Sequence, residues 1–160
     1  MEKHLDEDDF IVSKTDLKGH ITYGNDKFIE MSGYTESELL GSAHNILRHK
    51  DMPKVVFQLL WQRVQSKQEI FAYVKNRCKN NDFYWVFTNV TASIDKNGKT
   101  IGYYSVRRKP SAKAIEIISS IYGDLINIEK DSGMDASSKF LEELLNKNKV
   151  TYDEFISSIQ

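Results

Sequence analysis

Cysteine is almost absent from this sequence, and its scarcity excludes two common ways of stabilising a small domain. Cys78 is the single cysteine among 160 residues, so neither an intramolecular disulfide nor a zinc cluster built on cysteines can form. Cys78 lies in a predicted strand without a resolving cysteine, and we interpret it as an inert residue rather than a redox thiol.

The sequence also lacks a surplus of charge of either sign and any long apolar run. Its 22 basic and 23 acidic residues leave a net charge of −1, which does not favour a nucleic-acid partner. No apolar run is long enough to span a bilayer, and the acidic N-terminus is unlike a signal peptide. We therefore expect a cytoplasmic protein that does not insert into a membrane, although it can still act at one through a partner.

Motifs of catalysis are missing as well. The sequence contains no nucleophile elbow, no phosphate-cradling glycine loop and no two-histidine zinc helix. His44 and His49 lack the carboxylate frame of a metal-ion site, although either could ligate a haem iron. We expect neither an enzyme nor a metal-ion site.

Turn-forming residues divide the first two thirds of the chain into five strands and a group of short helices. The helices lie between the second and third strands, which favours an α+β fold with an antiparallel sheet. The expected strands cover residues 10–12, 21–23, 71–79, 83–94 and 101–109. We divide the chain into an N-terminal cap (1–9), a domain (10–110) and a C-terminal helical region (111–160).

Capping residues predict where the helices of the domain begin. Asn25 or Asp26 is expected to cap a first helix, and Thr35 begins a capping-box pattern for a second. Asp51 stands where the N-cap of a third helix is expected, with Pro53 just inside that helix. Its apolar stripe continues to about Ser66.

The C-terminal region carries an apolar seam at helical spacing. Its positions are Ala114, Ile118, Ile121, Leu125 and Ile128. Such a short seam is marginal by itself, and three outcomes are open. The seam can form a coiled coil with a second copy, dock on a receptor helix, or fold back over the sheet of its own domain.

Two polar features suggest a ligand pocket. Alternation along the third strand places Asn76 on the same face as Ala72 and Val74, so its amide is expected to be buried and to need partners. A protein network or a planar heterocycle can supply them. Arg48 precedes the third helix and is suited to a phosphate or carboxylate.

Several aromatic side chains accompany these polar residues. Trp61, Tyr84 and Trp85 can stack on an aromatic ligand, although each taken singly is better explained as a core residue.

The chain resembles the PAS sensory domains, and in particular those of aerotaxis receptors, over about residues 10–110. The matching segments are Asp16-Leu17, Ile21–Asn25, Ser32–Tyr34, His44–Pro53, Val74–Arg77, Tyr84–Val86 and Gly102–Arg107. The resemblance implies a five-stranded antiparallel sheet with short helices over one face, enclosing FAD. The short chain is most similar to the PAS partner of a bipartite energy-taxis receptor.

Site residues follow from the resemblance by position. Arg48, His49, Asp51 and Trp61 match residues on which FAD binding depends in such domains. Asn25 and Asn76 match polar residues of the flavin pocket, and His44 falls in the same segment. We add Trp85 as an aromatic candidate.

The sequence departs from related flavin domains at one position. Those domains often carry a tryptophan just before the strand that bears the asparagine, whereas Ile70 stands here with Phe71 beside it. The cysteine-bearing signature of photoreceptor PAS domains is also missing from the helical segment. We therefore expect no light-driven thiol adduct.

These observations lead to three functional hypotheses. The first is a redox sensor for aerotaxis or energy taxis, in which FAD is the cofactor and a membrane chemoreceptor or its HAMP-like signalling region is the partner, with a homodimer as a further option. The second is a haem-based gas sensor with His44 or His49 as the iron ligand. The third is an interaction module without a cofactor.

Overall fold

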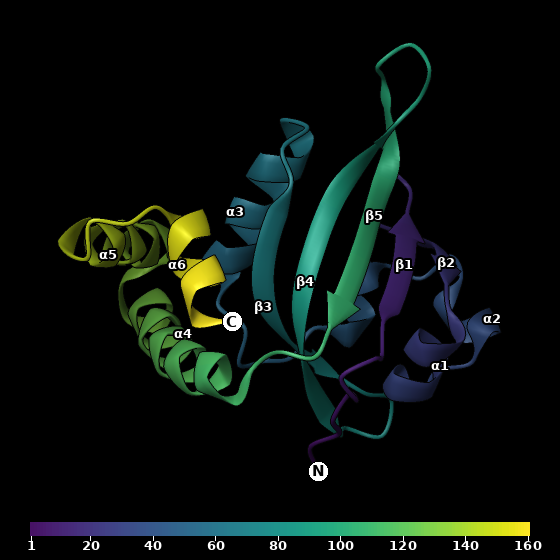
Figure 1. Cartoon of the computed structure of the whole chain (residues 1–160), viewed down its shortest axis with the longest axis horizontal. Coiled ribbons are helices and arrows are strands. Elements are labelled where there is room, and N and C mark those ends of the chain that lie inside the picture. Colours follow the sequence, from purple (N-terminus) through teal and green to yellow (C-terminus); the bar gives the residue numbers. More distant parts are fainter.

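A five-stranded antiparallel sheet forms the centre of the molecule. The computed structural model describes residues 1–160 and orders the strands β2-β1-β5-β4-β3. They are β1 (Ile11–Thr15), β2 (Ile21–Gly24), β3 (Ile70–Arg77), β4 (Phe83–Ile94) and β5 (Thr100–Arg108). The predicted α+β class and antiparallel sheet are confirmed, and the long β4–β5 hairpin projects beyond the other strands (Figure 1).

Four short helical elements pack on one face of this sheet. They are α1 (Asp26–Ser32), α2 (Glu36–Leu39), the 3₁₀ turn η1 (His44–Leu47) and α3 (Lys54–Gln65). Local signals account for the first two. The Asn25 side chain accepts the N–H of Phe28, and Thr35 forms the predicted capping box. Gly33 ends α1 with a φ of 76°, a conformation that favours glycine.

The start of α3 differs from the prediction. Pro53 occupies the N-cap position and offers no side-chain hydrogen bond, so the expectation that Asp51 caps this helix was wrong. The free N–H groups of Lys54 and Val55 instead donate to the carboxylate of Glu129, at 2.7 and 3.4 Å. The cap comes from a residue 75 positions away in the sequence.

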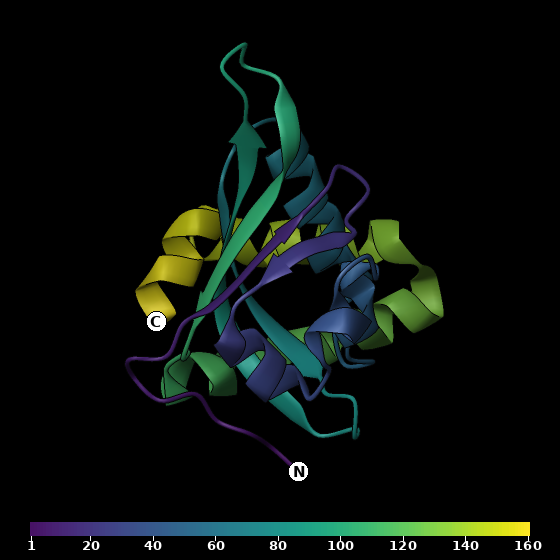
Figure 2. The ribbon, with the colours of Figure 1, turned by 90° about the vertical axis from the view of Figure 1, so that its right-hand side faces the viewer.

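Three C-terminal helices lie along the β3 edge of the sheet. They are α4 (Ala112–Ser132), α5 (Met134–Lys147) and α6 (Tyr152–Ile159). Figure 1 shows them on the β3 side, opposite α1 and α2, and Figure 2 shows the same arrangement turned by 90°. The side chains of Ala114, Ile118, Tyr122 and Leu125 are buried, so the apolar side of α4 folds back onto its own domain.

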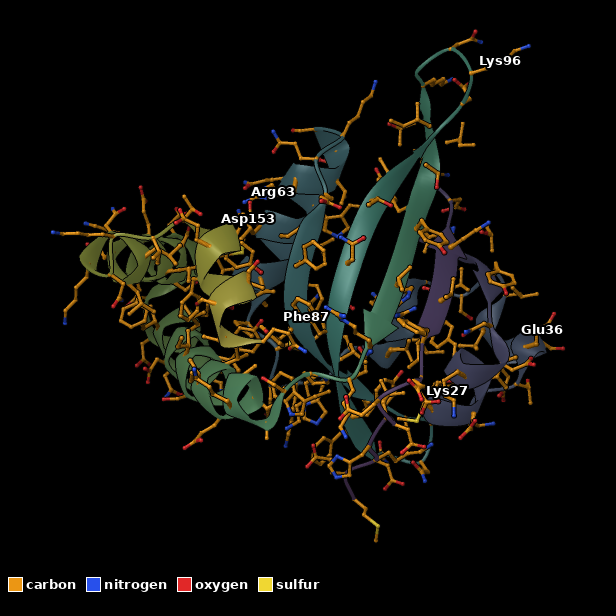
Figure 3. All side chains as sticks on the ribbon, in the orientation of Figure 1. Lys27, Glu36, Arg63, Phe87, Lys96 and Asp153 are labelled. Atoms are coloured by element: carbon orange, nitrogen blue, oxygen red, sulfur yellow. The ribbon has the colours of Figure 1, made fainter.

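Two tyrosines of these helices close the exposed edge of β3. The hydroxyl of Tyr122 donates to the carbonyl of Tyr73 at 2.6 Å, and that of Tyr152 donates to the carbonyl of Phe71 at 2.8 Å. An ion pair between Arg63 of α3 and Asp153 of α6 (Figure 3) lies beside Tyr152, whose ring centroid is 5.9 Å from the Arg63 guanidinium. An unpaired edge strand would otherwise present free carbonyls to other chains.

The N-terminal residues also pack on the domain. The N–H of Lys3 donates to the carbonyl of Phe83 at 2.8 Å, and Leu5 is buried in the core. None of the helices has the length and apolar character that crossing a membrane requires.

Candidate ligand-binding site

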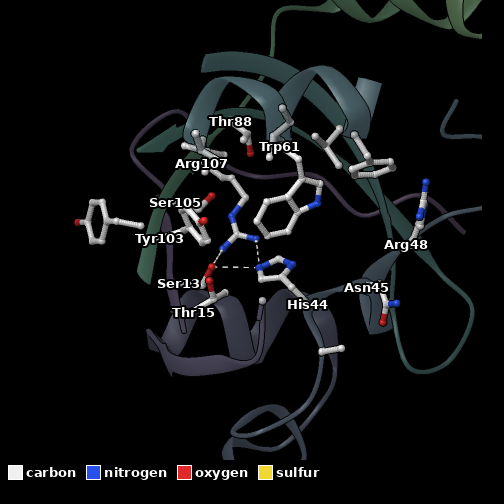
Figure 4. Close-up of a pocket in the computed structure, with 18 of the residues that line it drawn as sticks. Ser13, Thr15, His44, Asn45, Arg48, Trp61, Thr88, Tyr103, Ser105 and Arg107 are labelled. Carbon is white, nitrogen blue, oxygen red and sulfur yellow. Dashed lines mark hydrogen bonds between the residues drawn. The ribbon is translucent and has the colours of Figure 1, made fainter. Parts of the chain in front are cut away.

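A cavity of about 300 Å³ lies between the helices and the inner face of the sheet, a volume at the lower end of the range for small-molecule sites. Strands β1, β3, β4 and β5 supply one wall, and η1 and α3 supply the other. The principal lining residues are Ser13, Thr15, His44, Asn45, Arg48, Phe57, Leu60, Trp61, Val64, Val74, Asn76, Thr88, Val90, Tyr103, Ser105 and Arg107 (Figure 4).

The polar centre of the cavity is formed by three side chains from separate elements. Arg107 of β5 donates to the hydroxyl of Ser13 on β1, and its Nη1 lies 3.3 Å from Nε2 of His44. Ser13 Oγ lies 3.1 Å from the same nitrogen (Figure 4). Because a guanidinium can only donate, Nε2 of His44 accepts from Arg107. The proton of the neutral ring is therefore on Nδ1.

Arg107 is a buried cation without a counter-ion. Its exposed fraction is 2%, no carboxylate pairs with it, and its Nε has no hydrogen-bond partner. Its guanidinium lies over the ring of Phe28, 4.8 Å from the centroid. Burial lowers the pKa of Arg107 to about 10, and no aspartate or glutamate lines the cavity. The site therefore favours a ligand that brings negative charge or strong acceptors.

Burial also decides the charge of His44. Desolvation, together with the nearby charge of Arg107, lowers the pKa of His44 to about 3. The ring is stacked against Phe28, with 5.8 Å between the centroids. His44 is consequently neutral at physiological pH.

A second group of polar atoms lacks partners farther along the inner face of the sheet. Asn76 is 4% exposed, as alternation predicted, and its amide lies next to the hydroxyl of Tyr84. The hydroxyls of Tyr84 and Thr88 are buried and unpaired. Burial raises the pKa of Tyr84 to about 12. Buried polar groups are normally satisfied, so this group points to a missing partner.

Aromatic rings line the side of the cavity next to α3. The indole of Trp61 packs edge-on against Tyr103, with 5.2 Å between ring centroids, and is 37% exposed. Arg48 is exposed and lies 4.1 Å from the ring centroid of Phe57. Ile70 is buried beside Val64 and Val90 and does not line the cavity.

The structure brings together four of the eight predicted site residues. His44, Arg48, Trp61 and Asn76 line the cavity, whereas Asn25, His49, Asp51 and Trp85 do not.

Each residue outside the cavity has protein partners. The amide of Asn25 joins β1 to α1, since it accepts from Val12 and Phe28 and donates to Phe10. Asp51 pairs with Lys75 at 2.8 Å, and this contact holds the pKa of Asp51 below its usual range. The other two residues contact aromatic rings, His49 that of Phe83 and Trp85 that of Tyr122.

Sequence reasoning missed Arg107, Ser13 and Thr88 as site residues. The signal was present in the alternation of β5, where Tyr103, Ser105 and Arg107 share the inner face. An arginine that alternates with partly buried neighbours on a central strand marks an unusual site.

Comparisons with known proteins agree on one family. A sequence description of the PAS fold matches residues 21–107. The aerotaxis receptor of Escherichia coli (strain K12) is 40% identical over 118 residues, which are 74% of this chain and 23% of the receptor. The nitrogen fixation regulatory protein of Klebsiella pneumoniae is 26% identical over 97 residues, which are 61% of this chain and 20% of that protein. The chain spans less than a quarter of the length of these curated relatives.

Solved structures share the fold at lower identity. A light-oxygen-voltage domain studied with a flavin analogue has a TM-score of 0.61 and 19% identity, and the match covers 72% of this chain and 86% of that one. The light-oxygen-voltage domain of the blue-light photoreceptor Aureochrome1 has a TM-score of 0.57 and 20% identity, with 75% and 85% covered. At this level of identity the likeness concerns the fold alone.

Proposed function

Because the chain belongs to the PAS family and is a PAS domain of the aerotaxis-receptor type, we propose that it is a redox sensor whose cavity binds FAD. The observation that carries the proposal is Arg107, a buried cation without a counter-ion in a cavity that no acidic residue lines. Such a cavity suits a planar ligand with acceptor atoms at its edge and phosphates outside.

The residues present fit a flavin nucleotide. Arg107, Ser13, Asn76 and the unpaired hydroxyl of Thr88 offer donors to a polar ring edge, and Trp61 offers an aromatic surface. The exposed Arg48 is placed to donate hydrogen bonds to phosphate oxygens. We assign no ligand role to the remaining predicted residues, because their partners belong to the protein.

FAD, when bound, supplies a redox centre whose hydrogen-bonding pattern changes on reduction. The amide of Asn76 can present either a donor or an acceptor, so it can match both patterns by turning over. Since Asn76 lies on β3, a change in its orientation would alter the strand that contacts the C-terminal helices. Asn76 is thus the residue that we propose senses the redox state.

The sensor would act in the cytoplasm on a membrane chemoreceptor or on a HAMP-like signalling region, and a homodimer is compatible with this role. The relatives in the comparison are a receptor and a regulatory protein. A sensory domain needs a partner that converts its conformational change into a signal.

Absorbance of the purified protein tests the cofactor. We expect a two-banded flavin spectrum, release of FAD on denaturation, and roughly ten- to hundredfold weaker FAD binding in Arg107→Met, since charge-assisted hydrogen bonds are lost. Arg108→Met is the matched control, because Arg108 is exposed and its guanidinium lies by Phe87 on the other face of the sheet.

Three outcomes would contradict the proposal. A sharp Soret band would indicate haem, with His44 as the candidate ligand because His49 lies outside the cavity. A colourless protein that takes up neither group would indicate an interaction module. Equal FAD affinities of the Arg107 and Arg108 variants would remove Arg107 from the site.

A further inference from the structure

We propose that the C-terminal helices respond through α3 to a ligand in the cavity. Polar contacts from these helices hold both the first and the last turn of α3. The identity of the ligand rests on the proposed function, whereas these contacts with α3 do not. Two acidic residues of the C-terminal region, Glu129 and Asp153, make the contacts.

Glu129 holds the start of α3. Its Oε1 accepts the N–H of Lys54 and its Oε2 accepts the N–H of Val55. The hydroxyl of Ser137, at the start of α5, donates to the same Oε2 at 3.2 Å. One carboxylate therefore joins α3, α4 and α5. A negative charge at a helix N-terminus is favourable, and Pro53 offers no alternative cap.

Asp153 holds the other end of α3. Both of its carboxylate oxygens lie within 3.1 Å of Nη1 of Arg63, in the last turn of the helix (Figure 3). Asp153 itself lies in the first turn of α6, between the two residues of its capping box, Thr151 and Glu154. The two contacts are independent, because they join different helices to α3.

Side chains of α3 also form a wall of the cavity. Phe57, Leu60, Trp61 and Val64 line it. A ligand that displaces these side chains must shift the helix or strain it. The same shift would move the Glu129 and Asp153 contacts, so occupancy and the packing of α4–α6 are coupled without crossing the sheet.

Coupling of this kind is reciprocal in free energy. Loosening the two contacts must change the affinity of the cavity, and filling the cavity must change the stability of the C-terminal helices. Both effects can be measured by hydrogen exchange, which reports local opening of helices.

The first experiment tests the contact of Glu129 with α3 in the full chain without cofactor. We expect Glu129→Ala to raise amide exchange in the first turn of α3 roughly fivefold, as loss of a cap predicts, and to raise exchange around Ser137 as well. Glu129→Gln should restore part of the protection, because its amide oxygen still accepts. Glu116→Ala is the control, since Glu116 is exposed on the same helix. Unchanged exchange in Glu129→Ala would show that Glu129 does not hold the start of α3.

The second experiment tests the coupling. FAD should reduce exchange over residues 112–160 in the wild-type chain, and this reduction should disappear in a Glu129→Ala, Asp153→Asn double variant that still binds FAD. Equal protection of residues 112–160 in both proteins, or protection confined to the cavity in the wild type, would overturn the coupling.

A third comparison separates this inference from the proposed function. If the protein binds no FAD, the proposed function fails, and Trp61→Ala serves as the perturbation of α3 from the cavity side. Introduced alone, Trp61→Ala should raise amide exchange in α4–α6. Added to the double variant, it should leave exchange in those helices unchanged. Equal responses of the two proteins would overturn the coupling whatever the ligand.

Discussion

At the residue scale, the cavity keeps two ionisable side chains in unfavourable surroundings. Burial disfavours the charged form of Arg107 and lowers its pKa to about 10, and the same effect keeps His44 neutral. No aspartate or glutamate lines the cavity to offset the cost. Residues that lower the stability of a ligand-free protein in this way are typical of binding sites, because the ligand supplies the missing partner.

His44 makes the stability of the ligand-free protein depend on pH. Its pKa is about 3 in the folded chain and about 6.5 when unfolded. Between these values the unfolded chain binds a proton that the folded chain does not, so the free energy of unfolding falls as the pH falls. We expect a loss of about 2 kcal/mol between pH 6.5 and pH 5 from this residue.

Denaturant unfolding at several pH values measures this effect. His44→Gln should flatten the acid side of the stability profile, whereas His4→Gln, which changes an exposed side chain, should leave its slope unaltered. An equally steep profile in His44→Gln would show that other groups cause the acid sensitivity.

Single residues of the site were predicted by two routes, strand alternation and position in the family resemblance, and the second gave His44, Arg48 and Trp61. Asn76 was found because strand alternation assigns a face, and the structure confirms that face. Trp85 pairs with Lys75 in the β3–β4 register and lies on the outer face, which requires the register to be known. Alternation along β5 places Arg107 on the inner face, but its partners come from β1 and η1 and cannot be read from that strand alone.

At the element scale, local chemistry predicted most boundaries. The β4 strand has the predicted limits, Asn81 and Gly98 adopt the positive φ expected of the two turns, and Thr35 forms its capping box. The prediction for the start of α3 failed because the residue that caps this helix, Glu129, comes from another helix. No window of neighbouring residues contains such a tertiary contact.

The edge of β3 provides a prediction for the C-terminal helices. Tyr122→Phe removes the hydroxyl that donates to the carbonyl of Tyr73 and leaves that buried carbonyl unpaired. We expect a loss of about 1–3 kcal/mol in the free energy of unfolding. Tyr23→Phe is the control because Tyr23 is 47% exposed. Equal stabilities of the two variants would show that water replaces the lost donor.

At the scale of the whole molecule, the sequence left the fate of the C-terminal region open. Its seam suited a coiled coil, a receptor helix or the chain's own sheet, because an apolar stripe does not identify its partner. The structure buries Ala114, Ile118 and Leu125 against the domain, with Tyr122 in place of the predicted Ile121. Side chains of β3 decide the outcome, since Tyr73 is fully buried beneath these helices and donates to the carbonyl of Ile156.

Removal of residues 111–160 should therefore expose a surface that associates with other chains. The truncated chain 1–110 would present the carbonyls of Phe71 and Tyr73 along the edge strand β3, and the rings of Tyr73 and Phe87 on the outer face of the sheet. Such edges pair with other chains. We expect the truncated chain to self-associate at concentrations at which the full chain does not, as measured by light scattering after size-exclusion chromatography. Lys75→Glu would place unpaired acidic charge on this strand and should reduce the association. A truncated chain that stays monomeric and as stable as the full protein would show that the edge needs no cover, and that α4–α6 are free to leave it.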